Sequence, residues 1–318
     1  MSKGRGWFVV RRLGVVLSSL VAASMLVFVF LNVLPGSPAE VILGTQSTPA
    51  SVAALTIQLG LNKPIWRQYL DWMGGLVNGN FGVSYISGQS IGHEIHQALL
   101  VTGPLVLLAM LIGLVIGVPL GLTGALYKGR WLGSVVGGLS QIGIAIPSVV
   151  AGILLTVGLS IKLHLFPSSG FPGWQDPWGS LRALVLPAFA LGVVEGAILA
   201  RYIRAAVMEQ LRSDYLRTAR SKGLRRSQAL RRHGLRVAAI PVVTVLGLEI
   251  ASLIVGAIVV ENIFALPGVG MMLLNAVNNR DLIVVQDIAM VVVTAVLLIN
   301  TLVDLSYQWL DPRLRGRR

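Results

Sequence analysis

The stretch that decides the fold is RYIRAAVMEQLRSDYLRTARSKGLRRSQALRRHGLR, residues 201–236. It holds eleven of the 26 Lys and Arg residues of the chain, and a hydrophobic segment lies on each side of it. Because Lys and Arg are concentrated in cytoplasmic loops, a basic segment between two hydrophobic ones indicates a loop on the cytoplasmic face of a membrane. The partner of this loop is then the main question about function.

Composition supports a membrane protein. The chain has 318 residues, of which 54% are hydrophobic and 12% are charged, about half the roughly 25% of a soluble domain. Several hydrophobic runs exceed the roughly 18–20 residues that a spanning helix needs. We therefore predict an all-α integral membrane protein with six transmembrane helices. The net charge of +13 lies between the spans, which favours membrane lipid and not nucleic acid as its partner.

The predicted organisation has five parts. A cytoplasmic N-terminus (1–9) precedes the first span (10–34), and a cap segment (35–98) follows on the extracytoplasmic side, with short amphipathic helices near 51–59 and 64–76. The core (99–310) carries the other spans and the basic loop at 205–236, and a tail (311–318) ends the chain. The other five spans lie within 99–127 and 131–161 and near 183–203, 237–260 and 287–309.

The distribution of charge predicts the orientation. Six spans place both termini on one side, and that side would hold 21 of the Lys and Arg residues against 5 on the other. This imbalance indicates a multi-pass protein of the plasma (inner) membrane with both termini in the cytoplasm.

Two features of the spans predict how the helices pack. Gly113, Gly117 and Gly121 recur every four residues, so they share one helix face and permit close approach of a neighbouring helix. Pro147 lies inside the third span, where it is expected to kink the helix.

Within the basic stretch, Leu211, Tyr215 and Ala219 recur every four residues and are expected to share a helical face. Gly223 then interrupts the helix, and Ser227 can cap a second short helix that ends near residue 236. The residues alone leave two readings open: a bent helical pair lying on anionic lipid, or one that docks on a protein.

The stretch resembles the coupling loop, or EAA loop, of permease subunits in ATP-binding-cassette (ABC) importers, and more closely the B-type permeases of the dipeptide, oligopeptide and nickel group. Arg217-Thr-Ala219 takes the place of Glu-Ala-Ala, with Gly223 in register, and Arg236 stands where many permeases have Pro. Similar motifs occur along the chain in the family's order, at residues 34–39, 59–64, 79–82, 264–270 and 311–313.

The resemblance implies a type I ABC importer permease fold and transport of peptides, with nickel or another small solute as the alternative. It implies a C-type permease partner, two ABC ATPase subunits and an extracytoplasmic solute-binding protein. ATP and Mg would bind the ATPases, so no cofactor is expected in this chain. The residues that it implies for coupling to an ATPase are Tyr215, Arg217, Thr218, Ala219, Lys222, Gly223 and Leu224.

Acidic residues inside predicted spans are candidates for the translocation path. A charge at the bilayer centre costs about 2.5–3.5 kcal/mol on insertion scales, so such residues usually face the bundle interior or a cavity. Glu195 and Glu249 lie near the middles of the fourth and fifth spans, where a carboxylate could meet an ammonium group of a peptide. Asp304 is nearer a helix end, which favours a structural role.

Other activities lack their motifs. No Gly-x4-Gly-Lys-Ser/Thr pattern is present, so we do not expect the chain to hydrolyse ATP or to be an enzyme. His93 and His96 are only two potential ligands, which predicts no metal site. The remaining alternatives are an intramembrane enzyme using Glu195, Glu249 or Asp304, for which no nucleophile and base are recognisable, and a channel or ion-coupled carrier that acts alone.

Overall fold

The computed structural model describes residues 3–33, 37–44 and 47–310, and in these residues the secondary structure is helical apart from one isolated bridge between Val83 and Ser90. The predicted all-α class is therefore confirmed. The motif expected at 34–36 and the tail at 311–318 lie outside the described residues. The chain divides into two compact units, residues 1–101 with 268–297 and residues 102–267 with 298–318.

Five helices are long and apolar enough to cross a membrane. They are α1 (Lys3–Val33), α5 (Ile91–Leu126), α8 (Pro177–Leu211), α11 (Leu235–Ile263) and α13 (Leu282–Leu310). A sixth span results if α6 (Trp131–Ala145) and the following α7 (Ser148–Leu155) with the π-helical turn η2 (Thr156–Lys162) count as one, although they are bent by 96°. The kink predicted at Pro147 is confirmed by this bend. Proline causes it because it has no N–H to continue the helical hydrogen bonds.

The first unit combines the cap segment with the ends of two long helices. It contains α1, α2 (Pro38–Leu43), α3 (Pro49–Gln58), α4 (Ile65–Val77), α12 (Val269–Asn278) and the first parts of α5 and α13. The two short helices predicted near 51–59 and 64–76 are confirmed as α3 and α4. The core of this unit is formed by Ile91, Ile95, Ala98, Val269, Ala276, Val284 and Ile288.

An aromatic cluster joins α1 to α4 within the first unit. The ring of Phe28 lies 5.4 Å from that of Tyr69 and 6.0 Å from that of Trp72. A 2.8 Å hydrogen bond links Ser24 Oγ and the Tyr69 hydroxyl. Trp72 Nε1 donates a 2.8 Å hydrogen bond to Asp287 Oδ1 on α13, so the indole satisfies its polar group while it packs among apolar side chains.

In the second unit, the glycine stripe of α5 packs against α8, as predicted. A Cβ atom at Gly117 would lie 2.8 Å from Leu199 Cβ, and one at Gly121 would lie 2.6 Å from Ile203 Cβ. The contact is reciprocal, because a Cβ atom at Gly196 of α8 would lie 2.9 Å from Ile116 Cβ. Only glycine permits this separation of the two backbones, so larger residues at these positions would push the helices apart.

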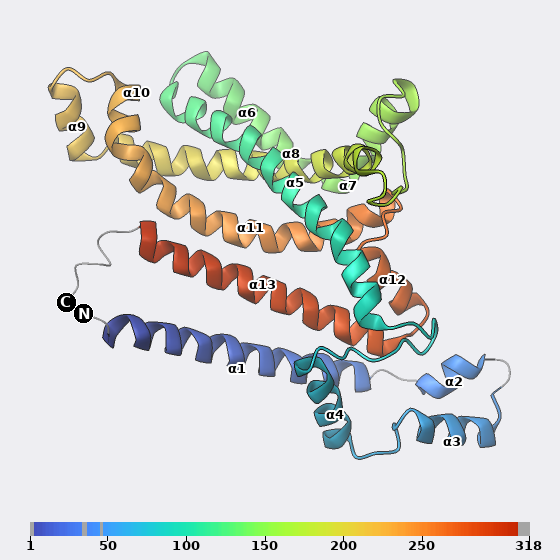
Figure 1. The fold of residues 1–318 in the computed structure, drawn as a ribbon. Helices are drawn as coiled ribbons and strands as arrows, with labels where there is room; N and C mark the ends of the chain where they lie inside the picture. Colours follow the sequence, from blue (N-terminus) through green and yellow to red (C-terminus); the bar gives the residue numbers. More distant parts are fainter. Residues whose placement is uncertain (1–2, 34–36, 45–46, 311–318) are drawn as a thin grey trace. The chain divides into compact units, whose positions relative to one another are not determined.

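The longest helix of the second unit, α8, begins before the predicted fourth span and ends after it. Asp176 caps its N-terminus, where Oδ1 accepts a 2.9 Å hydrogen bond from Gly179 N, and Pro177 occupies the first turn. These are favourable starting residues for a helix. Within this unit, the turn that leads to α11 and the loop that follows η2 lie at opposite ends of α8 (Figure 1).

Candidate functional site: a surface segment and a buried acidic pair

The basic stretch forms a compact turn between α8 and α11. It consists of α9 (Asp214–Ser221), α10 (Arg226–Ala229) and the π-helical turn η3 (Leu230–Gly234). Because α8 ends at Leu211 and α9 starts only at Asp214, the predicted shared face of Leu211, Tyr215 and Ala219 is wrong. The buried face of α9 instead carries Leu216 and Ala219.

The second half of the turn also differs from the prediction. Ser227 is not the cap of α10, because the helix begins at Arg226 and Arg225 is its N-cap; the backbone N–H of Arg225 donates a 3.1 Å hydrogen bond to Gln228 Oε1. Nor does the helix end near residue 236, since α10 continues through η3 into α11 without an intervening loop. Apolar side chains at Ala229 and Leu230 extend the buried face towards the fifth span, which favours continuation.

The turn is firmly attached to the rest of its unit. Leu216 is 0% exposed and packs in one cluster with Val207 of α8 and Leu230 of η3. Arg226 crosses to the end of α5, where Nη1 donates to Leu126 O at 3.2 Å and Nη2 donates to Ala125 O at 3.3 Å. A guanidinium at a helix C-terminus satisfies carbonyl groups that have no partner in the helix and interacts favourably with the helix dipole.

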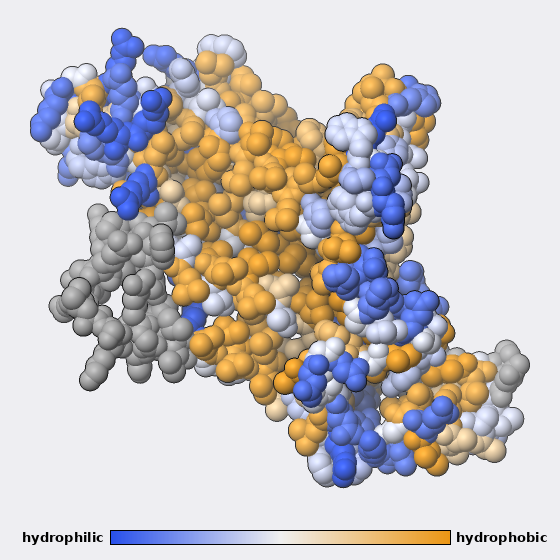
Figure 2. Space-filling view, in the orientation of Figure 1, coloured by the Kyte–Doolittle hydropathy of each residue, from blue (hydrophilic) through white to orange (hydrophobic). Residues whose placement is uncertain are grey.

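The outer surface of the turn carries most of the residues that the sequence singled out. Tyr215, Arg217, Thr218, Lys222 and Gly223 are exposed, Leu224 is half-buried, and Ala219 faces the apolar cluster. The Tyr215 hydroxyl donates a 2.7 Å hydrogen bond to Gln210 Oε1, which holds the ring in place although 42% of the residue is exposed. Hydrophilic residues gather over α9 and α10, whereas the long helices leading away from them are mostly hydrophobic (Figure 2).

Gly223 sets the bend between α9 and α10. Its φ of +92° is a conformation that side chains rarely adopt, and no atom lies within 4 Å of the position of a Cβ atom there. Its N–H donates a 3.0 Å hydrogen bond to Arg220 O, which closes the last turn of α9. Glycine is therefore required for its backbone conformation and not for space.

The two candidate path residues meet in the second unit. Glu195 of α8 is 4% exposed and Glu249 of α11 is half-buried, and their carboxyl groups lie close enough to interact electrostatically. Glu195 Oε1 has no hydrogen-bond partner among the described residues, and Arg201 interacts electrostatically with Glu249. The sequence placed both acids in mid-span but gave no signal that α8 and α11 would bring them together.

Sequence reasoning missed a third buried acid in this unit. Glu261 near the end of α11 is 0% exposed, and its Oε1 accepts a 2.5 Å hydrogen bond from Thr102 Oγ1. The span predicted near 237–260 stops one residue before Glu261, so the acid falls outside it. Its position one residue after that span is the signal that could have indicated burial.

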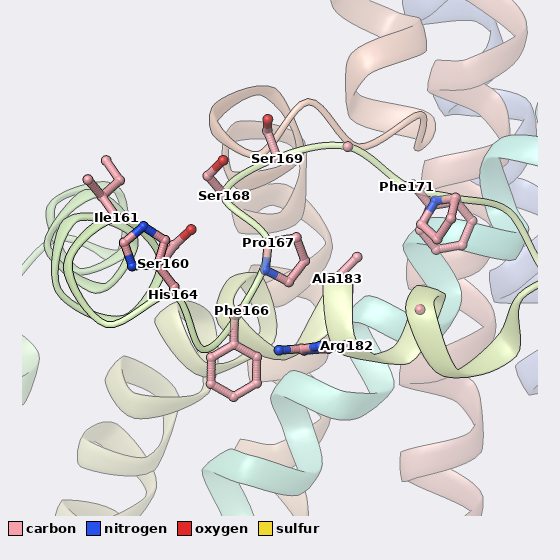
Figure 3. A pocket seen from close by; sticks show the side chains of 13 residues that line it. Ser160, Ile161, His164, Phe166, Pro167, Ser168, Ser169, Phe171, Arg182 and Ala183 are labelled. Atoms are coloured by element: carbon pink, nitrogen blue, oxygen red, sulfur yellow. The ribbon is translucent and has the colours of Figure 1, made fainter.

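An open pocket of about 960 Å³ lies at the other end of α8. Its loop is held by Arg182, whose Nε and Nη2 atoms donate to Leu165 O at 3.1 and 2.5 Å, and by Gly170 N, which donates to Phe264 O at 2.9 Å. Figure 3 shows Arg182 on the opposite side of the loop backbone from Ser168 and Ser169.

These observations define the class of the molecule: a multi-pass helical membrane protein with a structured basic turn between α8 and α11 and a pair of acidic residues that meet between these two helices. Residues 117–316 match the family described as the inner membrane component of binding-protein-dependent transport systems, and residues 6–104 match the N-terminal part of such components. The chain belongs to this family. It is thus an inner-membrane permease subunit of a multi-subunit ABC importer.

Relatives that match this chain over almost their whole length carry functional names. The chain is 34% identical to the dipeptide transport system permease protein DppB of Escherichia coli strain K12, covering 98% of this chain and 99% of the relative. It is 36% identical to the di/tripeptide transport system permease protein DppB of Pseudomonas aeruginosa, with the same coverage. It is 34% identical to the glutathione transport system permease protein GsiC of E. coli K12, covering 97% and 98%.

Solved structures agree on the fold. The inward-facing MetNI methionine ABC transporter matches 69% of this chain and 96% of its own chain, with a TM-score of 0.58 and 17% identity. An amino acid ABC transporter crystallised with histidines matches 68% and 93%, with a TM-score of 0.55 and 20% identity. The predicted type I ABC importer permease fold is thereby confirmed.

Proposed function

We propose that this chain is the B-type permease subunit of an ATP-driven importer of di- or oligopeptides. The observation that carries the proposal is the identity of 34–36% over almost the whole chain to permeases named for dipeptides and di/tripeptides. The glutathione permease among the relatives also handles a peptide by name. In the complete transporter, a C-type permease completes the path, two ATPases bind on the cytoplasmic side and a solute-binding protein delivers the peptide.

The surface segment α9–α10 is the element through which the ATPase acts. Its exposed residues, Tyr215, Arg217, Thr218 and Lys222, are available to a partner, whereas Leu216 and Arg226 anchor the segment to α8, α5 and α11. A segment that is rigidly attached to the spanning helices transmits a displacement of the ATPase to them, which a segment resting loosely on lipid would not do. If this segment meets the ATPase, six spans put both termini on the cytoplasmic side too, which agrees with the distribution of Lys and Arg.

The acidic pair lies on the translocation path in this proposal. Burying a carboxyl group with one unpartnered oxygen is costly, and the cost is understandable if a positive group occupies the site during transport. The N-terminal ammonium of a peptide is such a group. Glu195 and Glu249 then attract the ammonium end while the rest of the peptide passes along the apolar helix faces.

Assembly and uptake test the proposed function. The chain is expected to copurify with a second permease and two ATPase subunits, and the complex is expected to import dialanine only with ATP and its solute-binding protein. Robust dialanine transport by this chain alone would contradict the proposal. If the assembled complex imported nickel but not peptides, the assignment as a permease subunit would stand and peptides would be ruled out as its substrate.

Variants that keep the shape of the side chain but remove its charge test the path. In Glu195→Gln and Glu249→Gln, uptake of dialanine is expected to fall relative to uptake of N-acetyl-dialanine, because only the former carries an ammonium group. Glu209→Gln, an exposed change on the same helix as Glu195, is expected to leave this ratio unchanged. If both variants of the acidic pair showed an unaltered uptake ratio and rate, direct contact of the pair with the substrate would be ruled out.

A further inference from the structure

A guanidinium without a partner lies in the second unit, apart from the coupling segment and the acidic pair. Arg204 of α8 is half-buried, and its Nε atom is buried with no hydrogen-bond partner among the described residues. The side chain packs over glycines of two other helices. A Cβ atom at Gly124 of α5 would lie 3.3 Å from Arg204 Cδ, and one at Gly137 of α6 would lie 2.7 Å from Arg204 Nη1. The missing side chains at these glycines leave room for the guanidinium.

No group in the described part of the chain neutralises this charge. Arg204 takes part in none of the ion pairs found there, and the first acid after it on α8, Glu209, is five residues away and exposed. The carbonyl groups of Ala125 and Leu126, which end α5, accept hydrogen bonds from Arg226 instead. Taking a cation out of water without an anion is strongly unfavourable. An anion from outside the chain is therefore expected at Arg204.

The surroundings add positive charge. The turn between α5 and α6 carries Lys128 and Arg130, both exposed, and Lys128 lies about one helical turn beyond the glycine that Arg204 covers. Arg130 packs over the ring of Tyr127, 5.9 Å from its centroid, which leaves its charge in place. No Asp or Glu occurs in residues 95–175, so neither α6 nor this end of α5 supplies a carboxylate. Such a cluster attracts anions and repels cations.

The depth of Arg204 in the membrane indicates which anion it meets. Nine residues separate it from Glu195 near the middle of the predicted fourth span, which is roughly 14 Å along a helix. This is close to half of the roughly 30 Å hydrocarbon thickness. Tyr127 and Trp131, which flank the basic turn, are exposed, and these residue types are enriched at the membrane–water boundary. The anion therefore lies at the depth of lipid headgroups.

We propose that Arg204, with Lys128 and Arg130, binds the phosphate group of an anionic phospholipid. Nη1 and Nη2 of Arg204 are not fully buried, and together they can donate to two phosphate oxygens. The two cations of the turn repel the ammonium group of a zwitterionic headgroup, which favours a lipid with net negative charge. The site rests on the proposed function only for its orientation, which places it in the cytoplasmic leaflet, where anionic lipids gather.

Native mass spectrometry of the assembled transporter, titrated with phosphatidylglycerol or with phosphatidylcholine, tests the proposal. Arg204→Gln is expected to weaken the tightest phosphatidylglycerol site roughly tenfold or more, because hydrogen bonds to a charged group are lost, and to change phosphatidylcholine binding little. Arg212→Gln makes the same change at an exposed position just after α8 and is expected to leave both lipids unchanged.

A pair of adjacent glycines gives a steric test that keeps every charge. Gly137→Leu places a side chain where the guanidinium lies and is expected to weaken phosphatidylglycerol binding as Arg204→Gln does. Gly138→Leu, with nothing within 4 Å of its Cβ position, is expected to have no effect. Size-exclusion chromatography of each variant complex shows that it is folded and assembled.

Three results would overturn the proposal. Unchanged phosphatidylglycerol binding in both Arg204→Gln and Gly137→Leu would show that the lipid is held elsewhere. Displacement of the lipid by millimolar inorganic phosphate would assign the site to a free anion. Loss of another subunit from the Arg204→Gln complex, with lipid binding intact, would make an acid of that subunit the partner. Lipid binding is measured without substrate, so its failure is distinguishable from a failure of peptide import.

Discussion

Replacing Gly223 with valine tests whether transport requires the bend between α9 and α10. No atom lies within 4 Å of the new Cβ, so the substitution meets no steric obstacle beyond its own backbone. The cost comes from φ, which is +92°, a conformation that costs a non-glycine residue about 1–3 kcal/mol. At about 2 kcal/mol, the bent state loses roughly a factor of 30 in population.

The assay is uptake of labelled dialanine by cells that express the complete transporter, with membrane levels of the chain measured by immunoblot. Gly223→Val is expected to be inserted at normal levels but to transport little, and Gly223→Asn is expected to lose less, because asparagine tolerates positive φ better than valine.

A matched control separates strain from docking. Gly129 has a φ of +84° and equally open surroundings, in the basic turn between α5 and α6. Gly129→Val therefore imposes a similar strain away from α9 and α10, and its uptake is expected to stay near that of the wild type. Normal uptake by Gly223→Val, or an equal loss in the Gly129 variant, would refute the role of this bend in coupling.

Three further substitutions test the packing and the charges. Gly121→Val should lower the thermal unfolding temperature of the complex, because overpacking costs typically 1–3 kcal/mol, whereas Gly138→Val, with nothing within 4 Å of its Cβ position, should not; equal shifts would contradict the close approach of α5 and α8. Arg226→Ala should speed amide hydrogen exchange across α9 and α10, and the exposed Arg225→Ala should change it less. The same exchange rates in the two variants would show that the contacts of Arg226 with α5 do not stabilise this segment. The hydrogen bond from Lys63 lowers the pKa of Asp71 below its ordinary value, so its stabilisation is present above pH about 4 and disappears as the pH falls through the lowered pKa. Asp71→Asn should therefore speed exchange near the start of α4 at neutral pH but not in acid, and an effect independent of pH would count against the ion pair.

The parts of the site that could be predicted are those set by local sequence. The kink at Pro147, the glycine face of α5 and the bend at Gly223 each follow from the backbone chemistry of a single residue type. The shared face of Leu211 and Tyr215 failed, because a four-residue period assumes one continuous helix and α8 ends at Leu211. The cap at Ser227 failed because α10 begins at Arg226, so Arg225 is the N-cap and Ser227 lies inside the first turn.

The sequence by itself determined the membrane class, the approximate spans and the position of the basic segment between α8 and α11, because hydrophobic length, loop charge and a helix-breaking glycine are properties of short stretches of the chain. Only the tertiary structure decided which polar groups are buried together. The meeting of Glu195 with Glu249 and the packing of the Arg204 guanidinium over two glycines depend on how separate helices pack. The basic stretch has an exposed face on α9 and is anchored to α5 by Arg226. Counting charges along the chain does not reveal this difference, because exposed and anchored arginines look alike in the sequence.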